Sequence, residues 1–344
     1  MTHSLRLPVV QRVSSSAATS VHNSPLSGAI GLASSRAPTY LRAIVTARCP
    51  LSCPFCHREG DVASSATVGG LPREQLVALI SAGVLVGMRK IKLLGGDPLA
   101  RPDLAAVVAG VRAVDADVDI SVITAGVFAV SRLDELFAAG LSRCNVSIHG
   151  WSEAALATRG GNAKQHAMRT RFLEAVLKHG RPLKLNYVVS SDDNPDDLDS
   201  LLSWAAGRPL VVNTLDNLNE NDGADGVYDR LVQLRGTPTH VWEDPDPHSL
   251  PTLHLRWADG LEVEIKHQQL GKVAPWHACN GCTKRASCRE GIHAVRLTHR
   301  GVLRPCMDRD DLGLDLMPIL ETHGVDGVVS AWRNALGSQM EQAA

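Results

Sequence analysis

Residues 48–56 read Arg-Cys-Pro-Leu-Ser-Cys-Pro-Phe-Cys, so that three thiols lie within eight residues of chain. They come directly after an apolar run at 41–46, which has the length and the β-branched content of a buried strand. Loops at the carboxyl ends of barrel strands are where such folds hold their chemistry. This stretch is therefore the first candidate functional site.

Three closely spaced thiolates can ligate three irons of a [4Fe–4S] cluster and leave the fourth iron open to a reactive cofactor. A zinc site completed by a fourth ligand such as His57 is the alternative, although structural zinc sites usually use CxxC pairs. The eight cysteines form two tight groups and one single residue, unlike a disulfide framework. Cysteine groups of this kind indicate metal or cluster ligation in a reducing compartment, and we expect a cytoplasmic protein.

From Leu41 onward, short apolar runs alternate with longer amphipathic stretches, which is typical of repeated βα units around a parallel sheet. A full eight-stranded barrel takes about 250 residues, but this repeat fades near residue 213. The predicted fold class is therefore α/β, with an incomplete (β/α)6 TIM-like barrel. The expected strands are 41–46, 90–94, 119–123, 143–148, 183–189 and 210–213, and the expected helices are 73–87, 103–114, 131–139, 165–179 and 196–206.

Composition changes along the chain predict four parts. The start is rich in Ser, Ala and Thr, and a later stretch is rich in Asn, Asp, Gly and Pro, with one short helix expected near 228–234. Apolar runs at 254–257 and 261–265 flank Ala-Asp-Gly and predict a hairpin before the second cysteine group. The parts are a loosely ordered tail (1–35), the barrel (36–213), a connecting segment (214–250), and an auxiliary-cluster domain with C-terminal helices (251–344).

Composition also excludes several classes of function. Hydrophobic residues are 44% of the 344 and charged residues 21%, so the chain can bury a core and is not a disordered protein. The 35 Lys and Arg against 36 Asp and Glu give no charge excess for binding nucleic acid or an anionic membrane. The longest nearly apolar run, 76–88, is far shorter than the roughly 20 residues of a membrane helix.

The first cysteine group resembles that of the radical S-adenosylmethionine superfamily, with CxxxCxxC after a first strand and an aromatic residue before the third Cys. Residues 95–98, Gly-Gly-Asp-Pro, resemble the family's Gly-Gly-Glu-Pro, and residues 124–126, Thr-Ala-Gly, resemble its Thr-Asn-Gly. The resemblance implies a cluster on Cys49, Cys53 and Cys56, and cofactor contacts from Phe55, Gly95, Gly96, Asp97, Pro98, Thr124, Ser147 and Asn186.

The family's chemistry follows from the same resemblance. The cluster passes one electron to S-adenosylmethionine, which cleaves to a 5′-deoxyadenosyl radical that removes hydrogen from a small-molecule or nucleotide-like substrate. The implied cofactors are the cluster and S-adenosylmethionine, and the implied protein partner is an electron donor such as flavodoxin or ferredoxin. Asp97 is one methylene shorter than the family's Glu, so its polar contact must be rebuilt or bridged by water.

The second cysteine group begins with Cys279-Asn280-Gly281-Cys282 and continues with Cys288 and Cys306. A lone CxxC is ambiguous between zinc, redox and cluster roles. Two further thiols beyond a hairpin favour an auxiliary iron–sulfur cluster over zinc. We expect a second [4Fe–4S] cluster here and favour full ligation by Cys279, Cys282, Cys288 and Cys306. The alternative is that Cys288 is not a ligand, so that the fourth iron stays open to a purine or an amine.

Residues 295–306 resemble the C-terminal signature of the GTP 3′,8-cyclase family of molybdenum-cofactor biosynthesis, Arg-x-Arg-x-Thr-x-x-Gly-x-Leu-x-x-Cys. That family binds GTP with arginines, two of which Arg36 and Arg296 match by position, whereas Ala294 replaces a third. Cys282 and Cys306 are separated by 23 residues, ten more than in that family, and Cys288 lies between them. The CxxC-x5-C spacing also resembles the twitch and SPASM auxiliary domains of peptide and natural-product maturases.

Three functions remain open from the sequence. The first is a radical S-adenosylmethionine enzyme that acts on a nucleotide-like or specialised-metabolite substrate. The second is a peptide or natural-product maturase of the twitch or SPASM type. The third is a non-catalytic zinc or cluster-binding protein. Cys144, within an apolar run, is predicted to be a small buried hydrophobic residue in any of them.

Overall fold

The computed structural model describes residues 38–53, 56, 70–148, 150–189, 195–216, 223–244, 252–266, 277–285, 288 and 293–340. Within them, one sheet has the strand order β12-β11-β10-β1-β2-β3-β4-β5-β6-β9-β8-β7. Its centre is a run of neighbours in chain order, all paired in parallel. These strands are β1 (Tyr40–Thr46), β2 (Lys90–Gly95), β3 (Asp119–Thr124), β4 (Arg143–Ser147), β5 (Leu183–Val189) and β6 (Leu210–Asp216).

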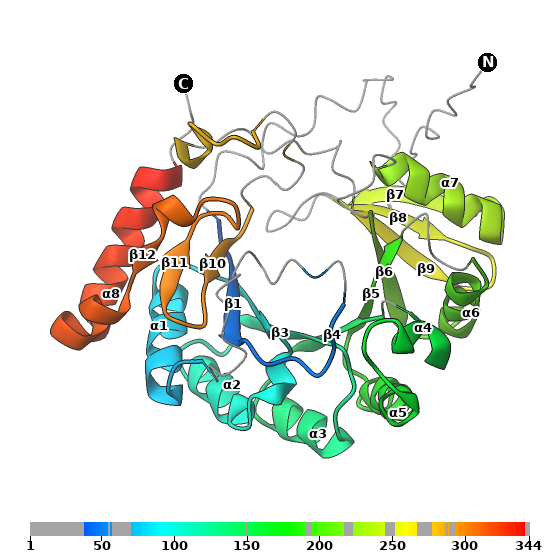
Figure 1. The fold of residues 1–344 in the computed structure, drawn as a ribbon, viewed down its shortest axis with the longest axis horizontal. Helices are drawn as coiled ribbons and strands as arrows, with labels where there is room; N and C mark the ends of the chain where they lie inside the picture. The colour runs from blue at the N-terminus through cyan, green and yellow to red at the C-terminus, as the bar shows by residue number, and fades with distance from the viewer. Residues whose placement is uncertain are drawn as a thin grey trace, which may run out of the picture.

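Helices connect successive parallel strands and lie outside the arc that the strands form (Figure 1). The mixed α/β class with a curved parallel sheet is thereby confirmed, and the strands and helices expected from the apolar periodicity agree with the observed ones to within a few residues. The helices are α1 (Arg73–Leu85), α2 (Leu104–Arg112), α3 (Val130–Ala138), α4 (Glu153–Ala157), α5 (Ala163–Lys178) and α6 (Pro195–Ala205).

The parallel strands have two unlike faces, because successive side chains in a strand point to opposite sides. Leu41, Ala43 and Val45 of β1 belong to the buried apolar core that packs against the helices. Tyr40, Arg42, Ile44 and Thr46 alternate with them along β1, so their side chains point to the opposite face of the strand, which is the inner side of the arc. The inner side is therefore available for polar chemistry while the outer side holds the fold together.

Both edges of the parallel sheet are extended by later parts of the chain. Beside β6, the predicted hairpin is confirmed as β8 (Thr252–Arg256) and β9 (Glu262–Lys266), and β9 runs parallel to β6. The sequence did not indicate β7 (His240–Asp244), which pairs with β8, and α7 (Gly223–Arg235) is longer than the expected short helix.

At the other edge, β10 (Val295–Leu297) pairs in parallel with β1, although about 250 residues separate the two strands. An antiparallel ladder then continues through β11 (Val302–Arg304) and β12 (Leu314–Asp315). Short 3₁₀ turns lie at η3 (Pro98–Ala100), η4 (His277–Cys279) and η5 (Asp310–Leu312). The second cysteine group is thus joined to the strand that precedes the first.

The last described helix, α8 (Met317–Met340), packs against α1. Trp332 is its fully buried anchor and lies over Gly83, where an added Cβ would come within 3.2 Å of the indole ring. The helical turns are interrupted at Gly324, whose φ is 62°. None of the described helices combines the length and the apolar character that crossing a membrane requires.

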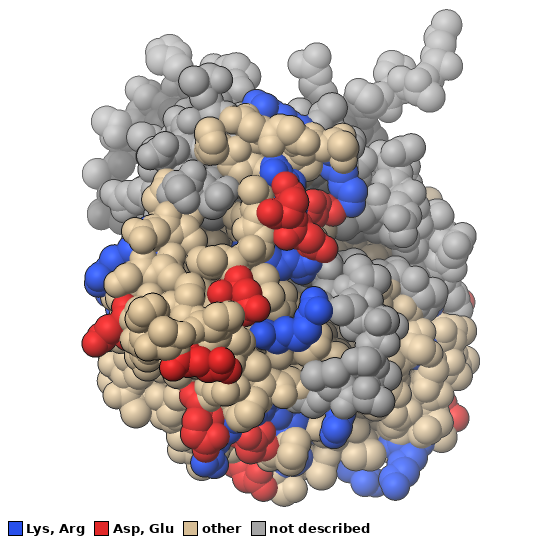
Figure 2. Space-filling model, turned by 60° about the vertical axis from the view of Figure 1, so that its left-hand side comes forward, with Lys and Arg blue, Asp and Glu red and all other residues tan. Residues whose placement is uncertain are grey.

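Charged side chains are interspersed on the described part of the face shown in Figure 2, with no continuous basic surface. This agrees with the balance of 35 basic and 36 acidic residues in the chain.

Trp332→Ala should lower the free energy of unfolding by about 3–5 kcal/mol, as expected when a large buried aromatic side chain is removed. The indole N–H has no hydrogen-bond partner among the described residues, so the loss is one of packing. Urea denaturation checks this, with the exposed neighbour Arg333→Ala as the control. A cost below 1 kcal/mol would mean that α8 does not stabilise the fold through this contact.

Candidate cofactor and cluster sites

The first cysteine loop begins where β1 ends. Cys49 and Cys56 are exposed and Cys53 is half-buried, and the Cys56 amide donates to the Cys53 carbonyl at 3.1 Å. Partial burial raises the pKa of Cys49 to about 11, and the charges of Asp97, Cys53 and Cys56 add to this rise. The three thiols are therefore close enough to act on one another.

The Gly95–Pro98 segment at the end of β2 lies directly against this loop. The Gly96 amide donates to the Thr46 carbonyl at 2.8 Å, and the Asp97 amide donates to the Arg48 carbonyl at 2.6 Å. A Cβ on Gly95 would lie 2.1 Å from the Thr46 oxygen, and one on Gly96 would lie 2.2 Å from the Arg48 oxygen. Because real Cβ contacts are never this short, both positions require glycine.

Asp97 joins the β2 loop to the β3 loop. Its carboxylate is 1% exposed and accepts hydrogen bonds from the Thr124 hydroxyl at 2.9 Å and from the Ala125 amide at 2.8 Å. It also accepts from the Leu99 amide at 3.0 Å. Burial raises the pKa of Asp97 to about 6, although these donors lower it. Because Ala125 contributes its backbone, Ala can replace the Asn of the Thr-Asn-Gly pattern.

A row of polar residues crosses the inner face of the next four strands. Ser147, Asn186, Asn213 and Glu264 are register partners on β4, β5, β6 and β9. The Asn213 amide donates to Asn186 Oδ1 at 2.9 Å, which leaves the Asn186 NH₂ group for another acceptor. Sequence analysis missed Asn213 and Glu264. Each of the two is a polar residue within an apolar run, which is the signal that the sequence offered. That they lie in one row with Ser147 and Asn186 depends on the order of the strands in the sheet.

Glu264 also neutralises a lysine on this face. Lys184 Nζ lies 2.8 Å from one Glu264 oxygen and 2.5 Å from the other, and the Glu264 side chain is 8% exposed. Buried charges are seldom left unpaired, because desolvating an isolated ion is costly. The β5–β9 side of the interior is thus close to neutral.

Basic residues dominate the opposite side of the interior. Arg296, Arg42, Lys92, Ser121 and Arg143 are successive register partners across β10, β1, β2, β3 and β4. We call this set the basic row. It was missed because its members are far apart in sequence, although they occupy alternate strand positions.

The groups around the basic row show its excess of positive charge. Burial lowers the pKa of half-buried Lys92 to about 8. Burial raises the pKa of Tyr40, but the positive charges of Arg42, Lys92 and Lys90 outweigh it and bring that pKa down to about 7. Arg143 is paired with Asp119 at 2.8 Å. This concentration of cations suits an anionic ligand.

The second cysteine group gathers near the end of β11. Cys306 is 9% exposed; burial raises its pKa, Arg296 lowers it and Cys288 raises it, so both residues act on this thiol. Lys284, two residues after Cys282, pairs with Asp308 at 2.5 Å. The Lys284–Asp308 ion pair thus links the CxxC turn to the Cys306 loop, and Cys288 and Arg296 lie within electrostatic range of the Cys306 thiol.

Arg309 links the CxxC turn to the Cys306 loop. Its guanidinium donates to the carbonyls of Ala278 and Asn280, the latter at 2.8 Å, and it pairs with Asp311 at 2.7 Å.

The donor chemistry of both groups suits iron–sulfur clusters. All eight cysteines are free thiols, and no disulfide consumes a ligand. Among the described residues, no three His, Cys, Asp or Glu side chains are already closed into a metal-binding group. A metal charge would offset the raised thiol pKa values, because coordination stabilises the thiolate. Phe55, Arg36, His57 and the tail at 1–35 lie outside the described residues.

Cys144 has no part in either group. It is fully buried in β4, as predicted, and burial raises its pKa well above the ordinary value.

Comparison with known proteins identifies relatives of this chain. Residues 43–205 match the family model "Radical SAM superfamily". The "Probable GTP 3′,8-cyclase" of Sulfurisphaera tokodaii is 27% identical over 283 residues, which cover 81% of this chain and 84% of that protein. The "GTP 3′,8-cyclase" of Clostridium botulinum is 25% identical over 275 residues, covering 78% and 81%.

A solved structure resembles the fold. The crystal structure of Streptococcus suis SuiB bound to S-adenosylmethionine has a TM-score of 0.56 at 12% sequence identity. The match covers 84% of this chain but only 65% of that chain. At this identity the likeness concerns the fold alone.

Asp97→Asn should change the pH dependence of stability in the metal-free protein. Because the folded pKa is about 6 and the unfolded value is 3.8, Asp97 contributes stability below pH 3.8, and this contribution is lost as pH rises through 6. From pH 7.5 to 5.5 the parent should gain about 1 kcal/mol relative to the variant.

Urea denaturation at both pH values measures this difference, with exposed Asp117→Asn as the control. If the difference in the free energy of unfolding between the parent and Asp97→Asn is the same at both pH values, the pKa of Asp97 is not raised in the folded protein.

Proposed function

We propose that this chain, of which residues 43–205 match the Radical SAM superfamily model, binds a [4Fe–4S] cluster on Cys49, Cys53 and Cys56 and cleaves S-adenosylmethionine there. The observation that carries the proposal is the contact of the Gly95–Pro98 segment with the cysteine loop through the amides of Gly96 and Asp97. It sets a glycine backbone beside a three-thiol site at the carboxyl edge of a parallel sheet.

The cofactor supplies the chemistry: one electron from the cluster cleaves the sulfonium, and the resulting carbon radical removes a hydrogen atom from the substrate. The protein's own task is to hold these groups and to exclude water. The Gly95–Gly96 backbone permits close approach of the methionine end. Ser147 and Asn186 offer polar groups on β4 and β5, and the hydrogen bond from Asn213 orients the Asn186 amide so that its NH₂ group would donate to a bound ligand.

We propose an auxiliary [4Fe–4S] cluster on Cys279, Cys282, Cys288 and Cys306. It is supported by the electrostatic effect of Cys288 on Cys306 and by the links from Arg309 and Lys284 between the two loops. With four thiolate ligands it would have no open iron, so it would serve electron transfer or electrostatic positioning. The electron donor to the enzyme would be a small redox protein of the flavodoxin or ferredoxin class.

The proposed substrate is a small anionic, nucleotide-like molecule. The basic row supports this, because Arg42, Lys92 and Arg296 stand together on the inner face. The GTP 3′,8-cyclases at 25–27% identity point in the same direction. Arg296 would contact both this substrate and the auxiliary site. Arg36 remains a proposed substrate residue on resemblance alone.

A peptide or natural-product maturase is the second candidate function. It is favoured by the CxxC-x5-C spacing of Cys279, Cys282 and Cys288. The basic row, in which Arg296 is buried and Arg42, Lys92 and Arg143 are half-buried, favours the small anionic substrate instead.

Anaerobically reconstituted protein should contain about eight irons and should form 5′-deoxyadenosine from S-adenosylmethionine and a reductant. Replacing Cys49, Cys53 and Cys56 by Ala should remove about half of the iron and all 5′-deoxyadenosine. Replacing Cys279, Cys282 and Cys306 by Ala should also halve the iron but leave some 5′-deoxyadenosine. Zinc with negligible iron in the parent would support the non-catalytic alternative.

Lys92→Met should weaken binding of GTP, used as the anionic probe, at least tenfold. A hydrogen bond to a charged group contributes about 1.5–3 kcal/mol, and Lys92 stands within the basic row. Equilibrium dialysis with anaerobic holoenzyme measures the affinity, and exposed Lys178→Met is the matched control. If the parent does not bind GTP while it still cleaves S-adenosylmethionine, the nucleotide-like substrate is wrong and the maturase gains support.

A further inference from the structure

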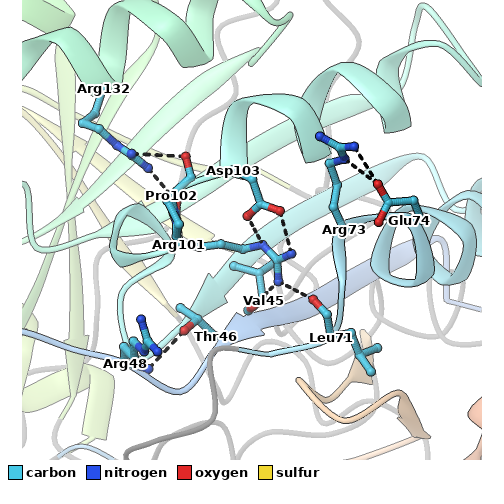
Figure 3. A network of polar contacts seen from close by, with 10 residues as sticks. All are labelled: Val45, Thr46, Arg48, Leu71, Arg73, Glu74, Arg101, Pro102, Asp103 and Arg132. Carbon is cyan, nitrogen blue, oxygen red and sulfur yellow. Dashed lines mark hydrogen bonds and ion pairs between the residues drawn. The ribbon is translucent and has the colours of Figure 1, made fainter.

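Arg101 is a buried arginine directly behind the first cysteine loop, and its side chain is 5% exposed. Its Nη1 donates to the Val45 carbonyl at 3.1 Å and to the Leu71 carbonyl at 2.9 Å (Figure 3). Val45 precedes the cysteine loop and Leu71 follows it in the chain. One nitrogen therefore holds the point where the chain leaves β1 and the point where it returns.

The rest of the guanidinium is fixed by Asp103. Arg101 Nε lies 2.8 Å from one carboxylate oxygen, and Nη2 donates to the other at 3.1 Å. A planar guanidinium can make this two-point contact and still offer Nη1 to the two carbonyls, whereas a lysine ammonium cannot do both. The side chain is thereby held in one orientation.

Gly70 allows the return of the chain to be this close. Its φ is 87°, and an added Cβ would lie 2.4 Å from the Val45 oxygen and 3.2 Å from Arg101 Nη1. Gly70 therefore lies between the Val45 carbonyl and the buried Arg101 guanidinium, where a side chain would not fit.

The backbone of Arg101 is also bound to α3, the helix that follows β3. Arg132 on α3 donates to the Arg101 carbonyl at 2.6 Å and to the Pro102 carbonyl at 3.2 Å (Figure 3). Asp97, four residues earlier, binds Thr124 and Ala125 at the start of the same connection. The segment from Asp97 to Arg101 therefore ties the loops after β1, β2 and β3 to one another.

We propose that Arg101 is a positioning residue for the first cluster: by binding the carbonyls of Val45 and Leu71 it closes the base of the cysteine loop and holds the three thiols opposite the Gly95–Pro98 segment. This inference rests on the proposed function of that loop. Arg101, a side chain outside the cysteine motif, would thus keep the cluster and S-adenosylmethionine correctly placed relative to each other.

The test compares Arg101→Met and Arg101→Lys with the parent as anaerobically reconstituted full-length protein. Arg73→Gln is the matched control, because Arg73 lies near Arg101 but is exposed, and among the described residues it pairs with the exposed Glu74 at 2.6 Å (Figure 3). The measurements are iron per chain, the dissociation constant of S-adenosylmethionine, the EPR change of the reduced cluster on adding it, and the thermal midpoint.

Arg101→Met should lose about half of the iron and should bind S-adenosylmethionine at least tenfold more weakly, with no EPR change on its addition. Arg101→Lys should retain iron but still bind several-fold more weakly, because the ammonium cannot hold both carbonyls and Asp103. Arg73→Gln should match the parent in every measurement.

A folded Arg101→Met protein with the parent's iron content, affinity and EPR change would overturn the proposal. If that variant does not fold, Arg101→Lys decides: parent-like affinity and EPR change in it would equally overturn the proposal. A parent protein that binds no iron and makes no 5′-deoxyadenosine would instead refute the proposed function, so the two failures are distinguishable.

Discussion

The hydrogen bonds from the Gly96 and Asp97 amides to the Thr46 and Arg48 carbonyls are the constraint on which the candidate active site depends. They bring the end of β2 against the start of the cysteine loop at distances that exclude any side chain at two successive positions. Once the backbone is held there, the residues that follow are fixed in direction. Asp97 reaches the β3 turn, and Arg101 reaches back to both ends of the cysteine loop. Three connections at one edge of the sheet thus behave as one unit.

The division of each strand into an apolar and a polar face explains how a stable fold carries a highly charged interior. Apolar side chains on the outer face are buried against the helices, and this hydrophobic burial stabilises the fold. On the inner face, burial of ions is offset by pairing where ligands are not expected, as between Lys184 and Glu264. Around the basic row, Arg143 is paired with Asp119, and the positive charges of Arg42 and Arg143 add to the effect of burial in lowering the pKa of Lys92. This concentration of positive charge is the feature that the proposed anionic ligand would use.

The pairing of β10 with β1 connects the part of the chain that carries the second thiol group to the strand that precedes the first. It places Arg296 beside Arg42, and because β11 runs antiparallel to β10, the chain reaches Cys306 at the edge of the sheet opposite to the first cysteine loop. Arg309 and Lys284 then hold the CxxC turn to the Cys306 loop. A substrate bound along the basic row would therefore lie between the first cluster and the auxiliary site.

The sequence by itself determined the parallel α/β core, because each main strand and helix there follows from a local apolar period, and it indicated the candidate thiol ligands, because their spacing is short. It also indicated Gly95–Pro98, Ser147 and Asn186 through motifs. Only the tertiary structure decided that β10 and β9 close the two edges, that Asn213 and Glu264 join the row of Ser147 and Asn186, and that Arg101 spans Val45 and Leu71. The physical reason is that these contacts join residues remote in sequence: whether a polar strand residue meets a partner, an ion or a ligand depends on which strands become neighbours, and no local pattern encodes that.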